Sequence, residues 1–208
     1  MLLLFTYHPS PITAFMEKNF LDGRVRVLVG DLTREGADAI VNAANSTLMG
    51  GGGVDGAIHR AGGAQILEEC REIRRTRLPD GLPTGEAVIT SGGLLAARFV
   101  IHTVGPIYGS HNGNEAELLA RCYENSLRLA AQNNLTSIAF PSISTGAFGY
   151  PRAEAAAVAS RAVADFLKDE TSLKEVRLIF FLPDDLKTFL KNHKFDDEEQ
   201  GTVNGSSE

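Results

Sequence analysis

Cysteine is scarce in this chain: Cys70 and Cys122 are its only two cysteines among 208 residues. They form no CxxC pair, and no cluster of cysteine and histidine occurs along the sequence. A disulfide framework, or a zinc site with ligands close in sequence, requires such spacings. The sequence therefore predicts a reducing, cytoplasmic location, with no bound metal and no disulfide-stabilised scaffold.

Basic charge and long apolar runs are also lacking. The chain has 20 Lys and Arg against 26 Asp and Glu, a formal net charge of −6. Proteins that bind duplex nucleic acid usually carry a basic face, so we expect no such partner. The apolar segment Met1–Phe5 is too short to cross a bilayer and has no signal-peptide flanks. We therefore expect no membrane association either.

The composition is that of one globular domain. Apolar residues make up 43% of the chain, and at this length a sizeable core can be buried without disulfides or metals. We expect residues 1–20 to be an N-terminal extension and residues 21–195 to be the folded domain. Residues 196–208 read DDEEQGTVNGSSE and are predicted to be a disordered acidic tail. No internal repeat is visible, and we expect a monomer.

Short apolar segments alternate with segments of helical periodicity. Strands are predicted at residues 24–29, 37–41, 86–90, 98–104, 137–140 and 176–182, and helices at residues 55–60, 64–75, 114–134, 151–168 and 183–191. This alternation predicts an α/β fold with helices on both faces of a sheet. In such sheets ligands bind at the carboxyl ends of the strands. Gly30–Asp31 and two glycine-containing loops follow predicted strands, so we expect them at one rim.

The first loop contains four consecutive glycines, Gly50 to Gly53. Glycine loses much conformational freedom on folding, so such a run often marks a ligand lying against the backbone. The loop formally contains GxGxxG, but NAANSTLMG separates the motif from its strand and no GK[ST] follows, which argues against Rossmann and P-loop sites. Judged on its glycines alone, the loop is either a phosphate-binding site or a flexible surface loop.

The second loop, residues 141–151, reads PSISTGAFGYP and follows the strand predicted at 137–140. Neither loop contains Lys or Arg between residues 42 and 56 or between residues 141 and 150. An anion held there would bind to backbone N–H groups and helix N-termini. Two such loops at one rim favour a nucleotide ligand; the alternative is two unrelated turns.

A few polar residues are candidates for chemistry. Asp55 and His59 are four residues apart and so lie on one face of a helix, where a carboxylate can position or deprotonate a water. Alternatively, Asp55 is an N-terminal helix acid and His59 a structural histidine. Asn42 is typical of a turn residue that bonds its own backbone. Asn45 has a donor and an acceptor suited to sugar hydroxyls, and Asp31 either accepts from an exocyclic amine or caps the chain.

Several segments together resemble the macrodomain family, specifically its MacroD-like hydrolase branch. They are GDLT at 30–33, DAIVNAANSTLMGGGGVDGAIHRAGG at 38–63, PTGEAVIT at 83–90, HTVGP at 102–106 and PSISTGAFGYP at 141–151. The resemblance extends over roughly residues 24–191, most of the chain. It implies a three-layer α/β/α fold around a mixed central sheet and the binding of ADP-ribose.

The resemblance also implies roles for individual residues. Asp31 and the backbone of Leu32 would read adenine. The loops over the diphosphate and distal ribose would be lined by Gly52, Gly53, Val54, Ser142, Ser144, Thr145, Gly146, Ala147 and Phe148. The hydrolase signature of this branch is Asn, six residues, two glycines, Val or Leu, and Asp, which Asn45 to Asp55 match. It implies that Asn45 binds the distal ribose hydroxyls and that Asp55, with His59 nearby, acts at the reacting end.

The implied activity is hydrolysis of esters on the distal ribose, with no cofactor. O-acetyl-ADP-ribose would be deacetylated, and mono-ADP-ribose would be removed from acidic side chains of proteins. The expected partners are therefore ADP-ribose, O-acetyl-ADP-ribose and mono-ADP-ribosylated proteins. Alternatives are a non-catalytic ADP-ribose reader and a phosphatase acting on ADP-ribose 1″-phosphate.

One departure from the family is expected at the adenine end. Many members carry an aromatic residue just after the last strand, which stacks on the base. The sequence prediction places Leu182–Pro183 in that position.

Overall fold

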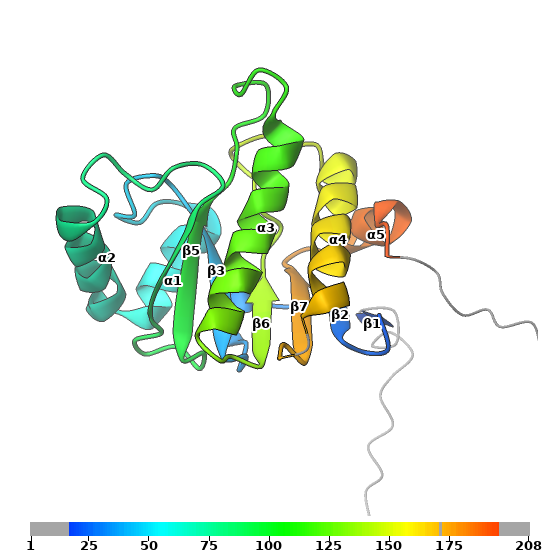
Figure 1. The fold of residues 1–208 in the computed structure, drawn as a ribbon, viewed down its shortest axis with the longest axis horizontal. Helices are drawn as coiled ribbons and strands as arrows, with labels where there is room; N and C mark the ends of the chain where they lie inside the picture. The colour runs from blue at the N-terminus through cyan, green and yellow to red at the C-terminus, as the bar shows by residue number, and fades with distance from the viewer. Residues whose placement is uncertain (1–16, 171, 196–208) are drawn as a thin grey trace, which may run out of the picture.

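A computed structural model of the chain describes residues 17–170 and 172–195 (Figure 1). The strands are β1 (Glu17–Phe20), β2 (Val25–Val29), β3 (Ala39–Ala44), β4 (Ala87–Ser91), β5 (Phe99–Val104), β6 (Ser137–Phe140) and β7 (Glu175–Phe180). The helices are α1 (Gly53–Gly62), α2 (Ala64–Thr76), α3 (Glu115–Gln132), α4 (Arg152–Asp169) and α5 (Pro183–Asn192), with the short 3₁₀ helix η2 (Leu32–Arg34) after β2. Residues 1–16 and the predicted acidic tail at 196–208 lie outside the described ranges. None of the helices described is long and apolar enough to cross a membrane.

The strands form one mixed seven-stranded sheet in the order β1-β2-β7-β6-β3-β5-β4. The central strands β2, β7, β6, β3 and β5 are mutually parallel, whereas β1 and β4 pair antiparallel at the two edges. The carboxyl ends of all five central strands therefore meet at one rim, at the top of Figure 1. This is the arrangement in which an α/β sheet binds its ligands.

Two hydrophobic cores, one on each face of the sheet, make the fold three-layered, as predicted. One core packs α3, α4 and α5 against residues such as Val41 and Ile101. The other packs α1 and α2 against their neighbours in the same strands, Ile40 and Val100. Side chains alternate between the faces of a strand, so both cores draw on β3 and β5. These two strands are consequently buried on both faces.

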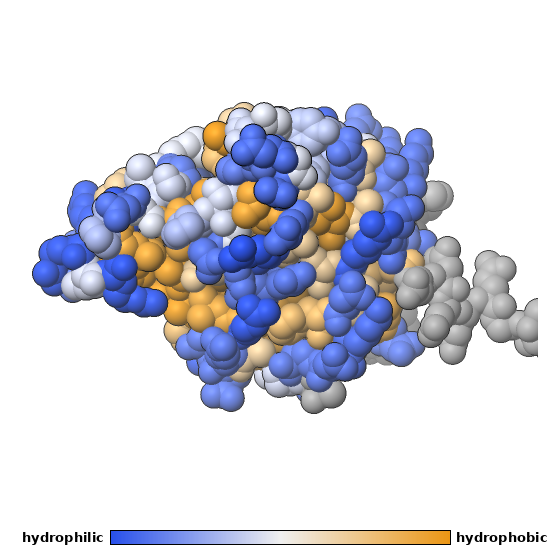
Figure 2. Space-filling model, turned by 45° about the horizontal axis from the view of Figure 1, so that its top comes forward, coloured by the Kyte–Doolittle hydropathy of each residue, from blue (hydrophilic) through white to orange (hydrophobic). Residues whose placement is uncertain are grey.

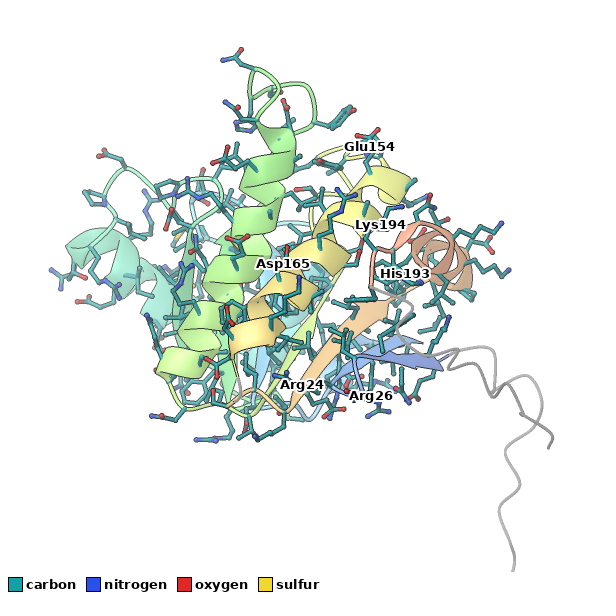
Figure 3. All side chains as sticks on the ribbon, turned by 45° about the vertical axis from the view of Figure 1, so that its right-hand side comes forward. Arg24, Arg26, Glu154, Asp165, His193 and Lys194 are labelled. Atoms are coloured by element: carbon teal, nitrogen blue, oxygen red, sulfur yellow. The ribbon has the colours of Figure 1, made fainter. Side chains whose placement is uncertain are left out.

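The N-terminal boundary of the folded region differs from the prediction at residue 21. Residues 17–20 form β1, which pairs antiparallel with β2 and buries Phe20. The sequence analysis missed this strand because EKNF is mostly polar, and its exposed edge position explains that composition. Arg26 connects β1 to the sheet by ion pairs with Glu17 and Glu175, both at 2.8 Å (Figure 3).

Two other boundaries matter for the site. β3 begins and ends later than predicted and runs to Ala44, so that Asn42 lies within the strand. β7 ends at Phe180, two residues earlier than predicted, so that Phe181 is the first residue of the following turn. Arg24 fixes the return of the chain into β7, because its guanidinium donates to the carbonyls of Leu167 and Leu173 at 2.9 and 3.0 Å (Figure 3).

Candidate functional site

Each sequence feature predicted to meet at the rim follows one of the parallel strands. Asp31 follows β2, the second loop follows β6, and the first loop follows β3. Because the sheet order runs β2-β7-β6-β3, these segments form a row along the rim, with the two loops on adjacent strands. Figure 2 brings this side forward and shows apolar residues exposed between hydrophilic ones.

The first loop presents a run of unused backbone donors. The N–H groups of residues 50–55 make no hydrogen bond to other described residues. Gly53 has φ +57° and begins α1, so the last of these donors belong to the first turn of a helix. A Cβ at Gly56 would lie 2.4 Å from the carbonyl oxygen of Gly51, so only glycine allows the loop to fold back onto α1. Free N–H groups at a helix N-terminus form a binding site for an anion.

The second loop also presents mainly backbone. The N–H groups of residues 145–148 have no hydrogen-bond partner in the described ranges, and Gly146 and Ala147 are exposed. Ser144 has φ +64°, and its buried hydroxyl packs against Gly105, where an added Cβ would lie 2.1 Å from Ser144 Oγ. Its hydroxyl is therefore buried against the residue that follows β5, and it has no hydrogen-bond partner among the described residues. Thr145 bonds through its hydroxyl to the carbonyl of Ser142 at 3.0 Å.

Asn45, Asp55 and His59 meet beside the first loop. A Cβ at Gly51 would lie 3.0 Å from Asp55 Oδ2 and 3.2 Å from Asn45 Nδ2, so both groups face the same point of the loop. The side chain of Asn45 also closes residues 45–50 by donating to the carbonyl of Gly50 at 2.9 Å. His59 Nε2 lies 3.4 Å from Asp55 Oδ1, and neither of its ring nitrogens has a hydrogen-bond partner among the described residues. A carboxylate oxygen and an amide thus face one point of the loop, and the imidazole lies beside the carboxylate.

Asn42 does not bond its own backbone as predicted. It is fully buried in β3, where Nδ2 donates to Asp55 Oδ1 at 2.7 Å and lies 3.1 Å from His102 Nδ1. Nε2 of His102 in turn lies 2.9 Å from Thr90 Oγ1. Burial lowers the pKa of His102 to about 3, so this imidazole is neutral. The carboxylate of Asp55 is therefore attached to a buried polar network that the sequence analysis did not predict.

At the other end of the rim, Asp31 caps η2, which is the alternative role considered for it. Its Oδ1 accepts from the N–H and the hydroxyl of Thr33 at 3.0 and 2.7 Å. These hydrogen bonds lower the pKa of Asp31, so its carboxylate is ionised. The side chain of Leu32 is buried in the core beneath this turn, so a ligand at the rim could contact only its backbone.

Phe181 is a rim residue that the sequence analysis missed. Phe181 is 78% exposed and is the first residue after β7. Val29 pairs in parallel with Phe180, and Gly30 N donates to Phe180 O at 2.9 Å, so Phe181 lies beside the Asp31 turn. The prediction failed because it extended the last strand to residue 182. An aromatic residue does follow the last strand, and the expected departure at Leu182–Pro183 is not found.

A cluster of cysteine and histidine does form in three dimensions. The donor atoms of His59, Cys70 and His102 lie within 4.8 Å of one another, although the residues are distant in sequence. Both nitrogens of His102 are already engaged by Asn42 and Thr90. Burial raises the pKa of Cys70 to about 12, so its thiol is protonated. A metal ion would have to displace these hydrogen bonds and deprotonate the thiol.

A separate groove contains none of the loop residues. It is lined by Arg161, Ala164, Asp165, Lys168, His193, Lys194 and Phe195. Three of these residues are labelled in Figure 3. The groove is beside the C-terminal half of α4, whereas the N-terminus of α4 follows the second loop at the rim.

The fold and the rim define an α/β protein with two loops of unpaired backbone amides beside a buried carboxylate. The macro domain family model matches residues 41–159. An O-acetyl-ADP-ribose deacetylase from Escherichia fergusonii is 56% identical over 147 residues, 71% of this chain and 82% of that protein. A macro domain-containing protein from Caldanaerobacter subterraneus is 50% identical over 171 residues, 82% of this chain and 96% of that protein. The chain belongs to the macro domain family.

Solved structures agree with this assignment. The Oceanobacillus iheyensis macrodomain with ADP has a TM-score of 0.81 and 47% identity, and the match covers 85% of this chain and 93% of that one. The Trypanosoma brucei macrodomain in complex with ADP-ribose has a TM-score of 0.74 and 40% identity, and the match covers 81% of this chain and 68% of that one.

Three further Oceanobacillus iheyensis structures carry single substitutions of an asparagine, a glycine and an aspartate. The glycine lies seven residues after the asparagine and the aspartate three residues after the glycine. Asn45, Gly52 and Asp55 have the same residue types at the same spacing. The structure of the glycine variant contains ADP-ribose.

The buried neutral state of His102 predicts a pH dependence of stability. The folded-state pKa of about 3 lies below the unfolded value of 6.5, so between these pH values the unfolded chain binds one more proton at this residue. Stability is therefore lost as pH falls from 6.5 toward 3, at about 1.4 kcal/mol per pH unit from this group. The free energy of unfolding of wild type should fall more steeply with acid than that of His102→Gln. Parallel curves for the two proteins would show that His102 is charged in the fold.

Proposed function

We propose that this protein is a hydrolase that binds ADP-ribose and cleaves esters on its distal ribose. Its substrates are O-acetyl-ADP-ribose and proteins that carry mono-ADP-ribose on acidic side chains. The observation that carries the proposal is the convergence of Asp55 Oδ2 and Asn45 Nδ2 at Gly51, next to the free N–H groups of the first loop. The similarity to the Escherichia fergusonii deacetylase supports the same activity.

ADP-ribose would lie along the rim. The adenine would stack on Phe181 and hydrogen-bond to Asp31 and the backbone of Leu32. The diphosphate would accept from the N–H groups of residues 50–55 and 145–148, so that binding needs no Lys or Arg in either loop. An acidic protein can hold an anionic ligand in this way. The distal ribose would then reach Asn45 and Asp55.

The chemistry requires one water. Oδ1 of Asp55 accepts from Asn42, which leaves Oδ2 to hold and polarise a water at Gly51. This water attacks the carbonyl carbon of the ester and forms a new C–O bond. The bond between that carbon and the ribose oxygen breaks, and the ribose oxygen takes one proton of the water. Each turnover consumes water and gives ADP-ribose and a carboxylic acid, for either class of substrate. Asn45 would orient the ribose hydroxyls, and His59 would contact the reacting end from its position beside Asp55.

The alternative is a reader that binds ADP-ribose without turnover. A reader needs the amide-lined loops and Phe181, but it has no use for a buried carboxylate aimed at the ligand. The placement of the Asp55 carboxylate at Gly51, beside Asn45, therefore favours the enzyme over the reader.

Replacing Asp55 with alanine should abolish most turnover of O-acetyl-ADP-ribose. We expect the rate to fall by about a hundredfold or more, because a positioned acid or base typically contributes that much. The measurement is acetate release by the purified protein, with the exposed Asp80→Ala as the matched control. ADP-ribose affinity, measured by calorimetry, should persist in Asp55→Ala. Tight binding with no turnover in wild type would identify a reader instead.

Replacing Phe181 with alanine should weaken ADP-ribose binding by about tenfold, the usual contribution of one base stacked on an aromatic side chain. Leu182→Ala is the matched control, because Leu182 is the neighbouring exposed apolar residue. Calorimetric titration of both variants gives the comparison. Equal affinities for wild type and Phe181→Ala would mean that the adenine does not stack at the end of β7.

A further inference from the structure

We propose that Asn42, His102 and Thr90 form a chain of positioning residues that fixes the orientation of the Asp55 carboxylate. This inference rests on the proposed hydrolase function. None of the three residues needs to touch the substrate, because they act through Asp55. These three residues lie in strands β3, β5 and β4 of the sheet, behind the proposed ligand site.

The register of the sheet brings these residues together. Asn42 of β3 is directly opposite His102 of β5, whereas Thr90 of β4 is opposite Val100 and reaches His102 diagonally. All three side chains lie on the face of the sheet that α1 and α2 cover, where Asp55 projects from α1. The exposed fractions of the four residues are 4% or less, so water does not compete for their hydrogen bonds.

The two donor protons of Asn42 set the direction of these hydrogen bonds, and His102 Nε2 also lies 3.8 Å from Cys70 Sγ. Both protons of Asn42 Nδ2 are used, one toward Asp55 Oδ1 and one toward His102 Nδ1. His102 Nδ1 must therefore accept, so the neutral ring carries its proton on Nε2 and donates it to Thr90 Oγ1. The Thr90 hydroxyl in turn donates a hydrogen bond to the carbonyl of Ser91 at 3.1 Å. Thr90 thus fixes the His102 ring, His102 fixes the Asn42 amide, and Asn42 fixes Asp55.

The consequence for Asp55 is a split between its two oxygens. Oδ1 is held by Asn42 at 2.7 Å, and Oδ2 is left facing Gly51 and Asn45. His59 does not substitute for Asn42, because its Nε2 lies 3.4 Å from Oδ1 and makes no hydrogen bond to it. Without the Asn42 donor the carboxylate is free to rotate, and its alignment with the attacking water is lost. Ligand binding by the loop amides does not depend on that alignment.

Because the Asp55 carboxylate and the loop amides act separately, we expect substitutions in this network to change kcat and not binding. Thr90→Val keeps the shape of the side chain but removes the hydroxyl, whereas Thr90→Ser keeps the hydroxyl. We expect Thr90→Val to lower kcat for O-acetyl-ADP-ribose by about tenfold and Asn42→Leu to lower it further. KM and the ADP-ribose dissociation constant should stay within about twofold. Thr90→Ser should restore most of kcat.

Two controls separate positioning from loss of stability. Ile138→Val destabilises the opposite core and should leave kcat unchanged. The ¹⁵N chemical shifts of the His102 ring should show the Nε2–H tautomer in wild type and Thr90→Ser, and a changed ring environment in Thr90→Val. This spectrum also tests the chain in any variant that is too unstable for kinetics.

Certain outcomes would overturn the inference. A wild-type kcat in soluble, folded Asn42→Leu and Thr90→Val would show that Asp55 needs no such support. An Nδ1–H tautomer in wild type would reverse the assigned direction of the chain. Absence of turnover in wild type would remove the proposed function, and this inference with it. Loss of ADP-ribose binding in step with kcat would point to a structural role instead.

Discussion

The hydrogen bond from Asn42 Nδ2 to Asp55 Oδ1 joins the centre of the sheet to the first turn of α1. This bond therefore fixes both ends of the glycine loop, one at β3 and the other at α1. Asn45 closes the first part of the loop, and contact between Gly51 and Gly56 determines how the rest folds back. The N–H groups of residues 50–55 have no hydrogen-bond partner among the described residues.

Under the proposed function, backbone amides rather than cationic side chains would hold the anionic ligand of this acidic protein. Dipoles fixed in loops and at helix N-termini need no reorganisation when a phosphate arrives. They also add no net positive charge to the rim. Two of the four glycines have distinct roles: Gly53 supplies a positive φ at the helix start, and Gly51 leaves space between Asn45 and Asp55.

The layered fold and the position of both loops at one rim were predicted from the sequence. Both predictions depend on local patterns, namely the periodicity of apolar residues and the alternation of strands and helices. The sequence analysis missed β1, whose polar residues suit an exposed edge, and it extended β7 past its end, which hid Phe181. It also assigned Asn42 to a turn. Local spacing could not show that Asn42, Thr90 and His102 meet Asp55, since their contacts join three strands and a helix. Short motifs identify the loops, whereas the network behind them depends on sheet register.

The central claim is that the unpaired amides of the two loops hold ADP-ribose at the carboxyl ends of the strands. Titration of ¹⁵N-labelled protein with ADP-ribose tests it directly. The account predicts that the largest changes in amide chemical shift occur at residues 50–55 and 145–148, followed by residues 31–32 and Phe181. Changes confined to the groove between α4 and Lys194, with both loops unaffected, would contradict it.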